Sequence, residues 1–389
     1  MKTIAIIPLR KGSKGISGKN KLKILGRPLY QWMLGAAIFS ELDEIYIFTD
    51  DEDVIKQVND EYSWTTKVKT LLRNSQNASD TASTEDAMLE FVEKINWNFD
   101  VICLLQATSP LTTYIDINKV VNMVKNEGFD STLTVVKTKR FIWDMDGNSL
   151  NYDYKNRPRR QDFDGLCIEN GAIYASTKAQ FLKSKNRLGD NIGIIEMPED
   201  TLTEIDEQSD ILVVEKLLLC RLNLYKTNPQ KIELLVLDVD GVFTDGSVSV
   251  SDEGELFKSF SLRDGMGLEN IELSGVEVIV MTSENSQIVQ SRMLKLGLEN
   301  NLFLGVKDKY SRLSQILTNK RLNRNQVAYV GDDINDLTNL ISVAWGICPK
   351  DAINQVKEQC DIILNNKGGN KAIREVTEFL IKYNKRFSK

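Results

Sequence analysis

Two stretches of the sequence carry residue types suited to phosphate chemistry. The first, residues 7–20, reads Ile-Pro-Leu-Arg-Lys-Gly-Ser-Lys-Gly-Ile-Ser-Gly-Lys-Asn and continues an apolar run. Its three glycines permit a tight loop whose backbone N–H groups can cradle phosphate, and its basic side chains supply positive charge. It lacks the Gly-Lys-Ser/Thr ending of a Walker A loop. A basic surface loop is the alternative, but the position directly after a strand favours phosphate binding.

The second stretch, residues 238–246, reads Asp-Val-Asp-Gly-Val-Phe-Thr-Asp-Gly and follows the apolar run Leu234–Leu237. Two carboxylates at a strand end can share the catalytic roles in the cleavage of a phosphate ester. Asp238 would attack phosphorus, while Asp240 would protonate the leaving alcohol and later activate water. By itself the pair also fits a solvated turn. Further polar residues at expected strand ends or helix starts favour catalysis: Thr282, Lys309 and Asp332.

The sequence contains no histidine. This excludes histidine bases, Ser-His-Asp triads and His-ligated zinc, so acid–base chemistry falls to Asp, Glu, Lys or Tyr. Any metal is expected to be bound through oxygen, which points to Mg²⁺.

Composition bounds the class of protein. The 389 residues suffice for two or three domains, and 42% apolar with 27% charged residues is ordinary for a soluble globular protein. The net charge of −6 argues against a nucleic-acid partner, which would need a basic face. No apolar run reaches the ~18–20 residues of a membrane span, and the start of the sequence resembles a strand rather than a signal peptide. The five scattered cysteines predict reduced core residues in a cytoplasmic protein.

The chain alternates strand and helix patterns from its start, and the alternation restarts at Ile232. This predicts an α/β fold of two doubly wound domains, each with a mostly parallel sheet between helices. Ligands of such sheets bind at the carboxyl ends of the strands, so Arg10, Asp50 and Gln106 should line one rim. The stretch from Asn223 to Lys231 is polar and aperiodic, which predicts domains 1–225 and 226–389.

The expected elements can be stated by residue. The expected strands are Thr3–Pro8, Ile45–Thr49, Val101–Leu105, Thr132–Val136, Leu234–Leu237, Val276–Met281, Gln326–Val330 and Val343–Ile347. The expected helices include Tyr30–Ser40, Ile115–Lys125 and Gln208–Leu222.

Five segments of the first domain resemble, in order, those of the CMP-sialic acid synthetases (acylneuraminate cytidylyltransferases). They are residues 7–20, 79–83, 106–111, 157–162 with 169–174, and 204–210. The resemblance implies a Rossmann-like nucleotidyltransferase domain. That domain would transfer CMP from CTP to a nine-carbon 2-keto-3-deoxy acidic sugar, sialic acid or KDN, and release pyrophosphate. The fourth segment and the second domain resemble animal synthetases more than short bacterial ones.

This resemblance also implies roles for individual residues, with Arg10 as the catalytic cation. The implied nucleotide-binding residues are Arg10, Ser13, Lys14, Lys19, Asn20, Arg73 and Asp80. The implied sugar-binding residues are Gln106, Arg160, Gln161 and Asn170. The spacing at Asn170-Gly171 by itself favours a turn. Asp206 is the implied Mg²⁺ ligand, and Glu204 replaces the first Asp of the family's Asp-Ile-Asp motif, so a second ligand there stays open.

Asp238, Asp240, Thr282, Lys309 and Asp332 in this order resemble the haloacid dehalogenase superfamily, and residues 240–246 with 263–265 resemble its KDO 8-phosphate phosphatase-like branch. The resemblance implies a capless Rossmannoid domain with Mg²⁺ on Asp238, Asp332 and the carbonyl of Asp240. Thr282 and Lys309 would bind the phosphoryl group. It also implies a homotetramer through the C-terminal domain, in which a neighbour covers the site. A dimer through the N-terminal domain is expected beside it.

Together these observations predict a bifunctional enzyme that releases a sugar from its 9-phosphate and then activates it with CTP. Three alternatives remain open from the sequence. The C-terminal domain could serve assembly alone, the pair could be a CMP-KDO synthetase with a KDO 8-phosphate phosphatase, or the chain could bind CTP without turnover. The substituent at carbon 5 of the sugar is not fixed by these residues.

Overall fold

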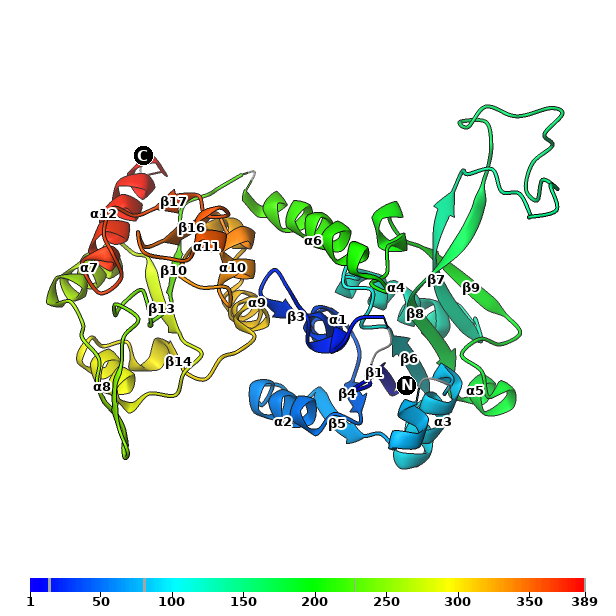
Figure 1. The fold of residues 1–389 in the computed structure, drawn as a ribbon, viewed down its shortest axis with the longest axis horizontal. Helices are drawn as coiled ribbons and strands as arrows, with labels where there is room; N and C mark the ends of the chain where they lie inside the picture. The colour runs from blue at the N-terminus through cyan, green and yellow to red at the C-terminus, as the bar shows by residue number, and fades with distance from the viewer. Residues whose placement is uncertain (13–14, 80–81, 227, 388–389) are drawn as a thin grey trace. The chain divides into compact units, whose positions relative to one another are not determined.

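A computed structural model describes residues 1–12, 15–79, 82–226 and 228–387 (Figure 1). The chain forms two compact units, Met1–Ile24 with Pro28–Leu217 and Leu25–Arg27 with Leu218–Lys389. The division falls inside α6 (Gln208–Asn223). Three predicted nucleotide-binding residues, Ser13, Lys14 and Asp80, lie outside the described residues.

The first unit is built on a seven-stranded, mostly parallel sheet. Only β8 runs antiparallel to its two neighbours. In sheet order the strands are β5 (Val68–Leu72), β4 (Glu44–Thr49), β1 (Thr3–Pro8), β6 (Val101–Leu105), β8 (Leu166–Thr177), β7 (Ser131–Thr138) and β9 (Ile192–Glu196). Two short strands, β2 (Lys23–Ile24) and β3 (Arg27–Pro28), precede the first helix.

Helices cover the two faces of this sheet, as the alternating pattern predicts. They are α1 (Leu29–Ile38), α2 (Glu52–Glu61), α3 (Thr84–Lys94), α4 (Tyr114–Asn126), α5 (Lys178–Ser184) and α6. The central strands consist of β-branched and other apolar residues that are almost completely buried, as expected of strands covered on both sides. Capping boxes fix the starts of α3, through Ser83 and Asp86, and of α4, through Thr113 and Asp116.

The prediction of a turn at Asn170-Gly171, which the spacing favours, is wrong. Both residues lie inside β8, where Gly171 has φ +67° and the pairing with β7 shifts register. The residue pair therefore marks a bulge within a long strand, since a positive φ there suits glycine.

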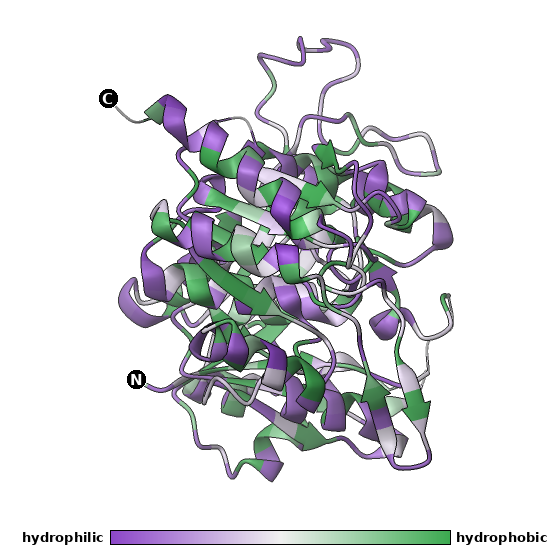
Figure 2. Cartoon of the chain, turned by 90° about the vertical axis from the view of Figure 1, so that its left-hand side faces the viewer, coloured by the Kyte–Doolittle hydropathy of each residue, from purple (hydrophilic) through white to green (hydrophobic). Residues whose placement is uncertain are grey.

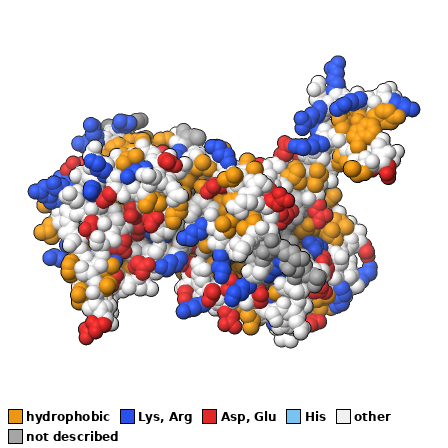
Figure 3. Space-filling view, viewed as in Figure 1, with side chains coloured by type: hydrophobic (Ala, Val, Ile, Leu, Met, Phe, Trp, Pro, Cys, Tyr) orange, Lys and Arg blue, Asp and Glu red, His pale blue; other side chains and the backbone are white. Residues whose placement is uncertain are grey.

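Between β7 and β8 the chain makes a long excursion, residues 139–165, that leaves the sheet (Figure 1). Aromatic side chains pack on one another within it, with Phe141 and Tyr152 ring centroids 4.1 Å apart. Figure 3 shows hydrophobic side chains gathered on its surface with basic ones around them. The exposed members include Trp143, Met145 and Tyr154. The sequence patterns did not predict this extension because it has no regular period.

The second unit has a six-stranded sheet in which all strands run parallel. In sheet order the strands are β14 (Leu302–Phe303), β13 (Glu277–Met281), β10 (Leu234–Leu237), β15 (Val327–Val330), β16 (Trp345–Cys348) and β17 (Ile362–Ile363). Its helices are α7 (Leu262–Leu273), α8 (Gln287–Lys295), α9 (Lys309–Lys320), α10 (Leu337–Ser342), α11 (Asn354–Lys357) and α12 (Ala372–Asn384). Colouring by hydropathy shows green strands and purple outer helix faces (Figure 2).

Only a short hairpin stands between β10 and α7 where a cap domain would be inserted. Its strands are β11 (Ser249–Ser251) and β12 (Gly254–Phe257). This agrees with the expected capless domain.

All five cysteines are free thiols, as expected. Cys103 and Cys348 are buried, but Cys167 and Cys220 are exposed, so the prediction of core positions is wrong for these two. Cysteine spacing alone carried no information on burial. Within the described ranges, no helix is both long enough and apolar enough to cross a membrane.

Candidate active sites

A cavity of about 310 Å³ lies at the carboxyl ends of β1 and β6 in the first unit. Its lining combines basic and amide side chains with the start of α3: Arg10, Lys19, Asn20, Arg73, Ser83, Thr84 and Gln106. The structure therefore brings Arg10 and Gln106 to one rim, as the strand-end argument predicts. Asp50, the third residue of that argument, accepts a hydrogen bond from the backbone N–H of Lys11 at 2.8 Å. Three cations beside a helix N-terminus make the cavity suited to a polyanion.

The cations of this cavity are held in place by the protein. The guanidinium of Arg73 is largely buried and donates to the backbone carbonyl of Asn77. Burial lowers the pKa of Arg73, although Glu90 and Asp50 oppose the shift. Asn20 donates from Nδ2 to the backbone carbonyl of Arg10 at 3.0 Å, which ties the two ends of the glycine-rich loop together.

Lys19 connects the cavity to the predicted metal ligand. Its ammonium donates to the backbone carbonyl of Ile205 at 2.8 Å and to Oδ1 of Asp206 at 3.0 Å. The Asp206 side chain is otherwise exposed. Asp210 accepts hydrogen bonds from the backbone N–H groups of Asp206 and Glu207, at 2.9 and 2.7 Å, so it fixes the turn that presents the Asp206 carboxylate.

The four predicted sugar-binding residues do not gather at one place. Gln106 lines the cavity, whereas Arg160 and Gln161 are exposed on the 139–165 extension and are not among its lining residues. Asn170 is buried with its amide engaged by the protein. Its Oδ1 accepts from the Thr134 hydroxyl at 2.7 Å, and its Nδ2 donates to the Thr201 hydroxyl at 3.1 Å. In this structure Asn170 braces the β8 bulge.

That bulge brings Glu204 close to the strand. A Cβ built on Gly171 would lie 2.1 Å from Oε1 of Glu204, so only glycine leaves room for the carboxyl group. Burial, followed by the charge of Asp206, raises the pKa of Glu204 above its usual value, although the Thr108 hydroxyl donates to it at 3.4 Å. No pattern in the sequence indicates this packing.

In the second unit a buried lysine sits between two aspartates at the strand ends. The Lys309 ammonium lies 2.8 Å from Oδ1 of Asp238 and 2.7 Å from Oδ1 of Asp336. Asp238 directly follows β10, and Lys309 is the first residue of α9, as predicted. Tyr329 donates its hydroxyl proton to Asp336 at 2.6 Å. The sequence analysis assigned no role to Asp336.

Three carboxylates of this site lie close enough to share one cation. Ligand oxygens of Asp238, Asp332 and Asp336 all fall within 4.8 Å of one another. Burial and then the charge of Asp336 raise the pKa of Asp238 well above its usual value. Burial, with Asp336 and Asp333, raises the pKa of Asp332 to about 7. A Cβ on Gly241, which has φ +79°, would lie 1.9 Å from Oδ2 of Asp332, so glycine lets Asp332 pack against the turn that follows Asp238.

Thr282 follows β13, is almost completely buried, and accepts a hydrogen bond from the backbone N–H of Glu284 at 3.2 Å. The strand ends of β10, β13 and β15 thus bring together the nucleophile, hydroxyl and acidic residues that the sequence predicts, because the sheet is parallel.

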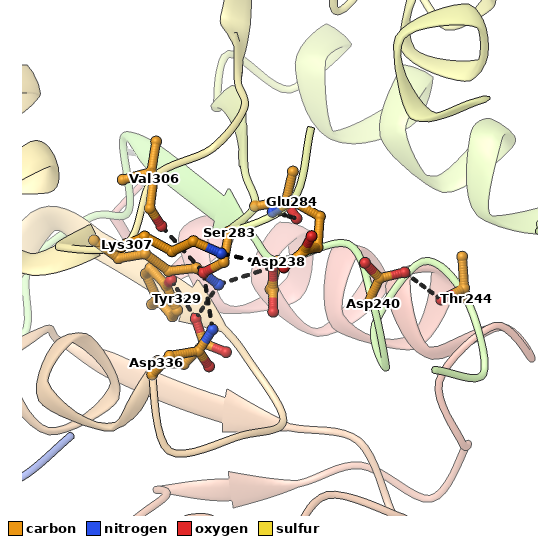
Figure 4. Close-up of polar contacts among 12 residues, drawn as sticks. Asp238, Asp240, Thr244, Ser283, Glu284, Val306, Lys307, Tyr329 and Asp336 are labelled. Atoms are coloured by element: carbon orange, nitrogen blue, oxygen red, sulfur yellow. Dashed lines mark hydrogen bonds and ion pairs between the residues drawn. The ribbon is translucent and has the colours of Figure 1, made fainter. Parts of the chain in front are cut away.

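The side chain of Asp240 is held by two residues of the loop and hairpin that follow it, Thr244 and Lys258. Its Oδ1 accepts from Thr244 at 3.3 Å, on the same loop (Figure 4). Lys258 donates to both Asp240 oxygens, at 2.8 and 3.0 Å. Burial alone would lower the pKa of Lys258, but Asp240 and Glu255 outweigh it and raise that pKa. Sequence reasoning missed Lys258, because one lysine in a hairpin carries no signal without the fold.

Comparison with known proteins assigns both units. Residues 4–188 match a family model described as cytidylyltransferase, and residues 302–374 match one described as haloacid dehalogenase-like hydrolase. N-acylneuraminate cytidylyltransferase of Oncorhynchus mykiss is 32% identical over 97% of this chain and 88% of its own length. N-acylneuraminate cytidylyltransferase A of Danio rerio is 30% identical over 97% and 88%.

The second unit has relatives of its own. The 3-deoxy-D-manno-octulosonate 8-phosphate phosphatase of Salmonella typhi is 34% identical over 155 residues, which are 40% of this chain and 82% of that protein. The order of motifs, the two strand-end sites and these relatives agree. The chain therefore belongs to the N-acylneuraminate cytidylyltransferase family, carries a C-terminal phosphatase part of haloacid dehalogenase type, and is a bifunctional enzyme of these two classes.

Proposed function

We propose that the first unit transfers CMP from CTP to sialic acid or KDN. The observation that carries this proposal is the cavity in which Arg10, Lys19 and Arg73 face one space beside Gln106. The anomeric hydroxyl oxygen of the sugar attacks the α-phosphorus and gives up its proton to solvent. The bond from the α-phosphorus to the oxygen that bridges to the β-phosphate breaks, and pyrophosphate leaves. The three cations offset the negative charge that collects on the phosphate oxygens, and such positioned charge is the largest single contribution to many enzymatic reactions.

Asp206 fits a Mg²⁺ ligand for this reaction. Its carboxylate is exposed, Asp210 orients its backbone, and Lys19 links it to the cavity. Exposed carboxylate oxygen is the donor that Mg²⁺ prefers, and a bound Mg²⁺ there would neutralise leaving pyrophosphate. Asn20 and three residues outside the described ranges, Ser13, Lys14 and Asp80, complete the proposed nucleotide site, as the resemblance implies.

For the acidic sugar we propose Gln106 as the residue that contacts its hydroxyls. Arg160 and Gln161 would read the sugar carboxylate, since the planar arginine fork matches a carboxylate. Their exposed position on the 139–165 extension requires that this segment approach a cavity when substrate binds. Asn170 would act indirectly, by holding the β8 bulge beside Ala172, whose carbonyl accepts a hydrogen bond from the backbone N–H of Gln106 at 3.1 Å.

We propose that the second unit hydrolyses the 9-phosphate of the same sugar. An Asp238 oxygen attacks phosphorus while the bond from phosphorus to the sugar oxygen breaks, and Asp240 gives that oxygen its proton. The products of this step are the free sugar and an aspartyl phosphate. Water then attacks the aspartyl phosphate, Asp240 takes the proton, and phosphate is released with Asp238 restored. Lys309 and Thr282 would hold the phosphoryl oxygens.

The acidic group of the second site fits Mg²⁺. Three carboxylates converge within 4.8 Å, and Oδ2 of Asp336 is buried without a hydrogen-bond partner in the described structure. Asp238, Asp332 and the carbonyl of Asp240 would hold the ion, with Asp336 beside it. When bound, Mg²⁺ supplies positive charge to the phosphoryl oxygens. The Lys309 ammonium would offset the negative charge that remains on the carboxylates.

We further propose that copies assemble through both units in the cytoplasm. The hairpin of the second unit exposes Val250, Leu256 and Phe257, which supports a tetramer built through this face. The exposed aromatic side chains of the 139–165 extension support a dimer through the first unit. The proposed domains are 1–225 and 226–389.

Two assays on the intact chain test the proposed substrates. Pyrophosphate release is measured with CTP and N-acetylneuraminate, N-glycolylneuraminate, KDN or KDO. Phosphate release is measured with the 9-phosphates of the first and third sugars and with KDO 8-phosphate. The proposal expects turnover of a nine-carbon sugar and of its own 9-phosphate. Preference for KDO and KDO 8-phosphate would contradict the proposed nine-carbon substrates and favour eight-carbon ones. Phosphate release from none of the three esters would contradict the proposed phosphatase substrate.

A further inference from the structure

Lys258 is the closest basic neighbour that the structure shows for the side chain of Asp240. It follows β12 and places its ammonium 2.8 and 3.0 Å from the two Asp240 oxygens. Thr244 adds a second donor to Oδ1 at 3.3 Å. Oδ1 therefore has two donors, whereas Oδ2 has Lys258 alone among these contacts. The arrangement fixes the plane of the carboxyl group and leaves Oδ2 with capacity for another partner.

The two side chains differ in how much of their surface is exposed. Lys258 is 3% exposed and Asp240 is 32% exposed. The Lys258 ammonium is thus enclosed by protein, while part of the Asp240 carboxyl group stays open to solvent. The short contacts that the structure shows for the Lys258 ammonium are to Asp240 and Glu255, so its contact with Asp240 is the interaction that needs an explanation.

Lys258 is itself anchored from its other side. Glu255 lies 3.4 Å from its ammonium and accepts a hydrogen bond from the Ser286 hydroxyl. Ser286 is the N-cap of α8 and accepts from the backbone N–H of Val289. A helix start thereby fixes Glu255, Glu255 fixes Lys258, and Lys258 fixes Asp240. Ordering these side chains costs conformational entropy. This series of contacts therefore indicates that the orientation of Asp240 matters.

We infer that Lys258 is a positioning residue for proton transfer, which aims Asp240 at the ester oxygen that leaves phosphorus. The inference rests on the proposed phosphatase reaction. In that reaction the bond from phosphorus to the sugar oxygen breaks and Asp240 gives its proton to that oxygen. Orientation matters most when the departing alkoxide is strongly basic, because such a group cannot leave without the proton.

Leaving-group dependence is the test. The probes are sialate 9-phosphate, whose leaving group is a primary alcohol, and p-nitrophenyl phosphate, whose phenolate leaves without a proton. Lys258→Met should lower kcat/KM by about 10- to 100-fold for the sugar phosphate, which reaches the low end of the ~10²–10⁴-fold range of general acid catalysis. It should hardly change kcat/KM for the aryl ester, because kcat/KM reports the step in which the ester oxygen leaves and not the later hydrolysis that both esters share. Lys258→Arg should recover most of the lost rate. Equal losses on both esters, or no loss on either, would overturn the inference.

A double-mutant cycle covers a variant that packs poorly. If Lys258 acts through Asp240, then Lys258→Met should cost little further kcat/KM in an Asp240→Asn background, because interacting residues are not additive. Additive losses would mean that Lys258 works elsewhere. Lys320→Met is the matched control, since it removes an ammonium 2.6 Å from Glu277 on the same unit. Wild type inactive on both esters would instead count against the proposed phosphatase reaction itself.

Discussion

Arg10 is the residue at which the proposed cytidylyl transfer is most easily interrupted. It lines the cavity with Lys19 and Arg73 at the end of β1. Arg10→Ala should lower kcat for pyrophosphate release by about 10²–10³-fold, the typical cost of one charge-assisted stabiliser, and should leave phosphatase activity intact. Lys11→Ala, which removes the neighbouring loop cation outside that cavity lining, is the control. Near-normal CTP turnover in Arg10→Ala would refute the proposed site.

Asp332 gives a second prediction at this scale. Burial, with Asp336 and Asp333, raises its pKa to about 7, so in the metal-free chain it is protonated below pH 7. Carboxyl groups must lose the proton to bind metal, so Mg²⁺ affinity of the second unit should fall about tenfold per pH unit below 7. The pKa lies above its unfolded value of 3.8, so the same shift should make the metal-free fold more stable as pH falls through 7. Calorimetric titration of Mg²⁺ at pH 6 and 8 checks this, and equal affinities would contradict it.

Residue types at strand ends were predictable, but their partners were not. An apolar run or a helix start in the sequence indicates the position of each of four residues: Asp238, Thr282, Lys309 and Asp332. A parallel sheet must bring them to one edge. Lys258 and Glu204 gave no such signal, since their roles depend on a hairpin and a strand bulge that no periodic pattern encodes. Asn170 was assigned to the sugar, and only the structure shows its amide engaged by Thr134 and Thr201.

At the scale of elements, the buried strands and amphipathic helices followed from their periodicity. The strands β1 and β6 begin and end as predicted, and α4 and α6 agree within two residues. The β8 bulge is the main miss, because Asn-Gly is as typical of turns as of a positive-φ bulge. The edge strands β5 and β9 were also missed, since their residues are only partly buried and their hydrophobic pattern is weak.

The bulge gives a prediction about this element. Gly171→Ala forces a side chain onto φ +67° and toward Glu204, which lies 2.1 Å from the added Cβ. We expect the free energy of unfolding of the first unit to fall by about 2–3 kcal/mol, with a raised KM for the sugar. Gly128→Ala is the control, since Gly128 has φ +79° with nothing within 4 Å of its Cβ, and should cost about 1 kcal/mol. Equal losses of unfolding free energy in the two variants, measured by urea unfolding, would show that the Glu204 side chain moves aside without an energetic cost.

For the whole molecule, the arrangement of one unit per activity leads to a prediction about separation. A chain that ends at residue 225 should fold, because the first unit has its own buried core and all residues proposed for CTP chemistry. It should retain CTP turnover and form a smaller assembly than the full chain, a dimer. Light scattering on both forms is the measurement, and the same assembly size for both would exclude the second unit as the builder of the tetramer.

Asp238→Asn tests the two-activity assignment most directly. The amide keeps the size of the carboxylate but loses its nucleophilicity and its negative charge toward Lys309 and a metal. Phosphate release from sialate 9-phosphate and pyrophosphate release from CTP with free sialic acid are measured on the same preparation. We expect the first to vanish and the second to match wild type. Phosphate release that persists in the variant would contradict the assignment of Asp238 as nucleophile of a separate phosphatase.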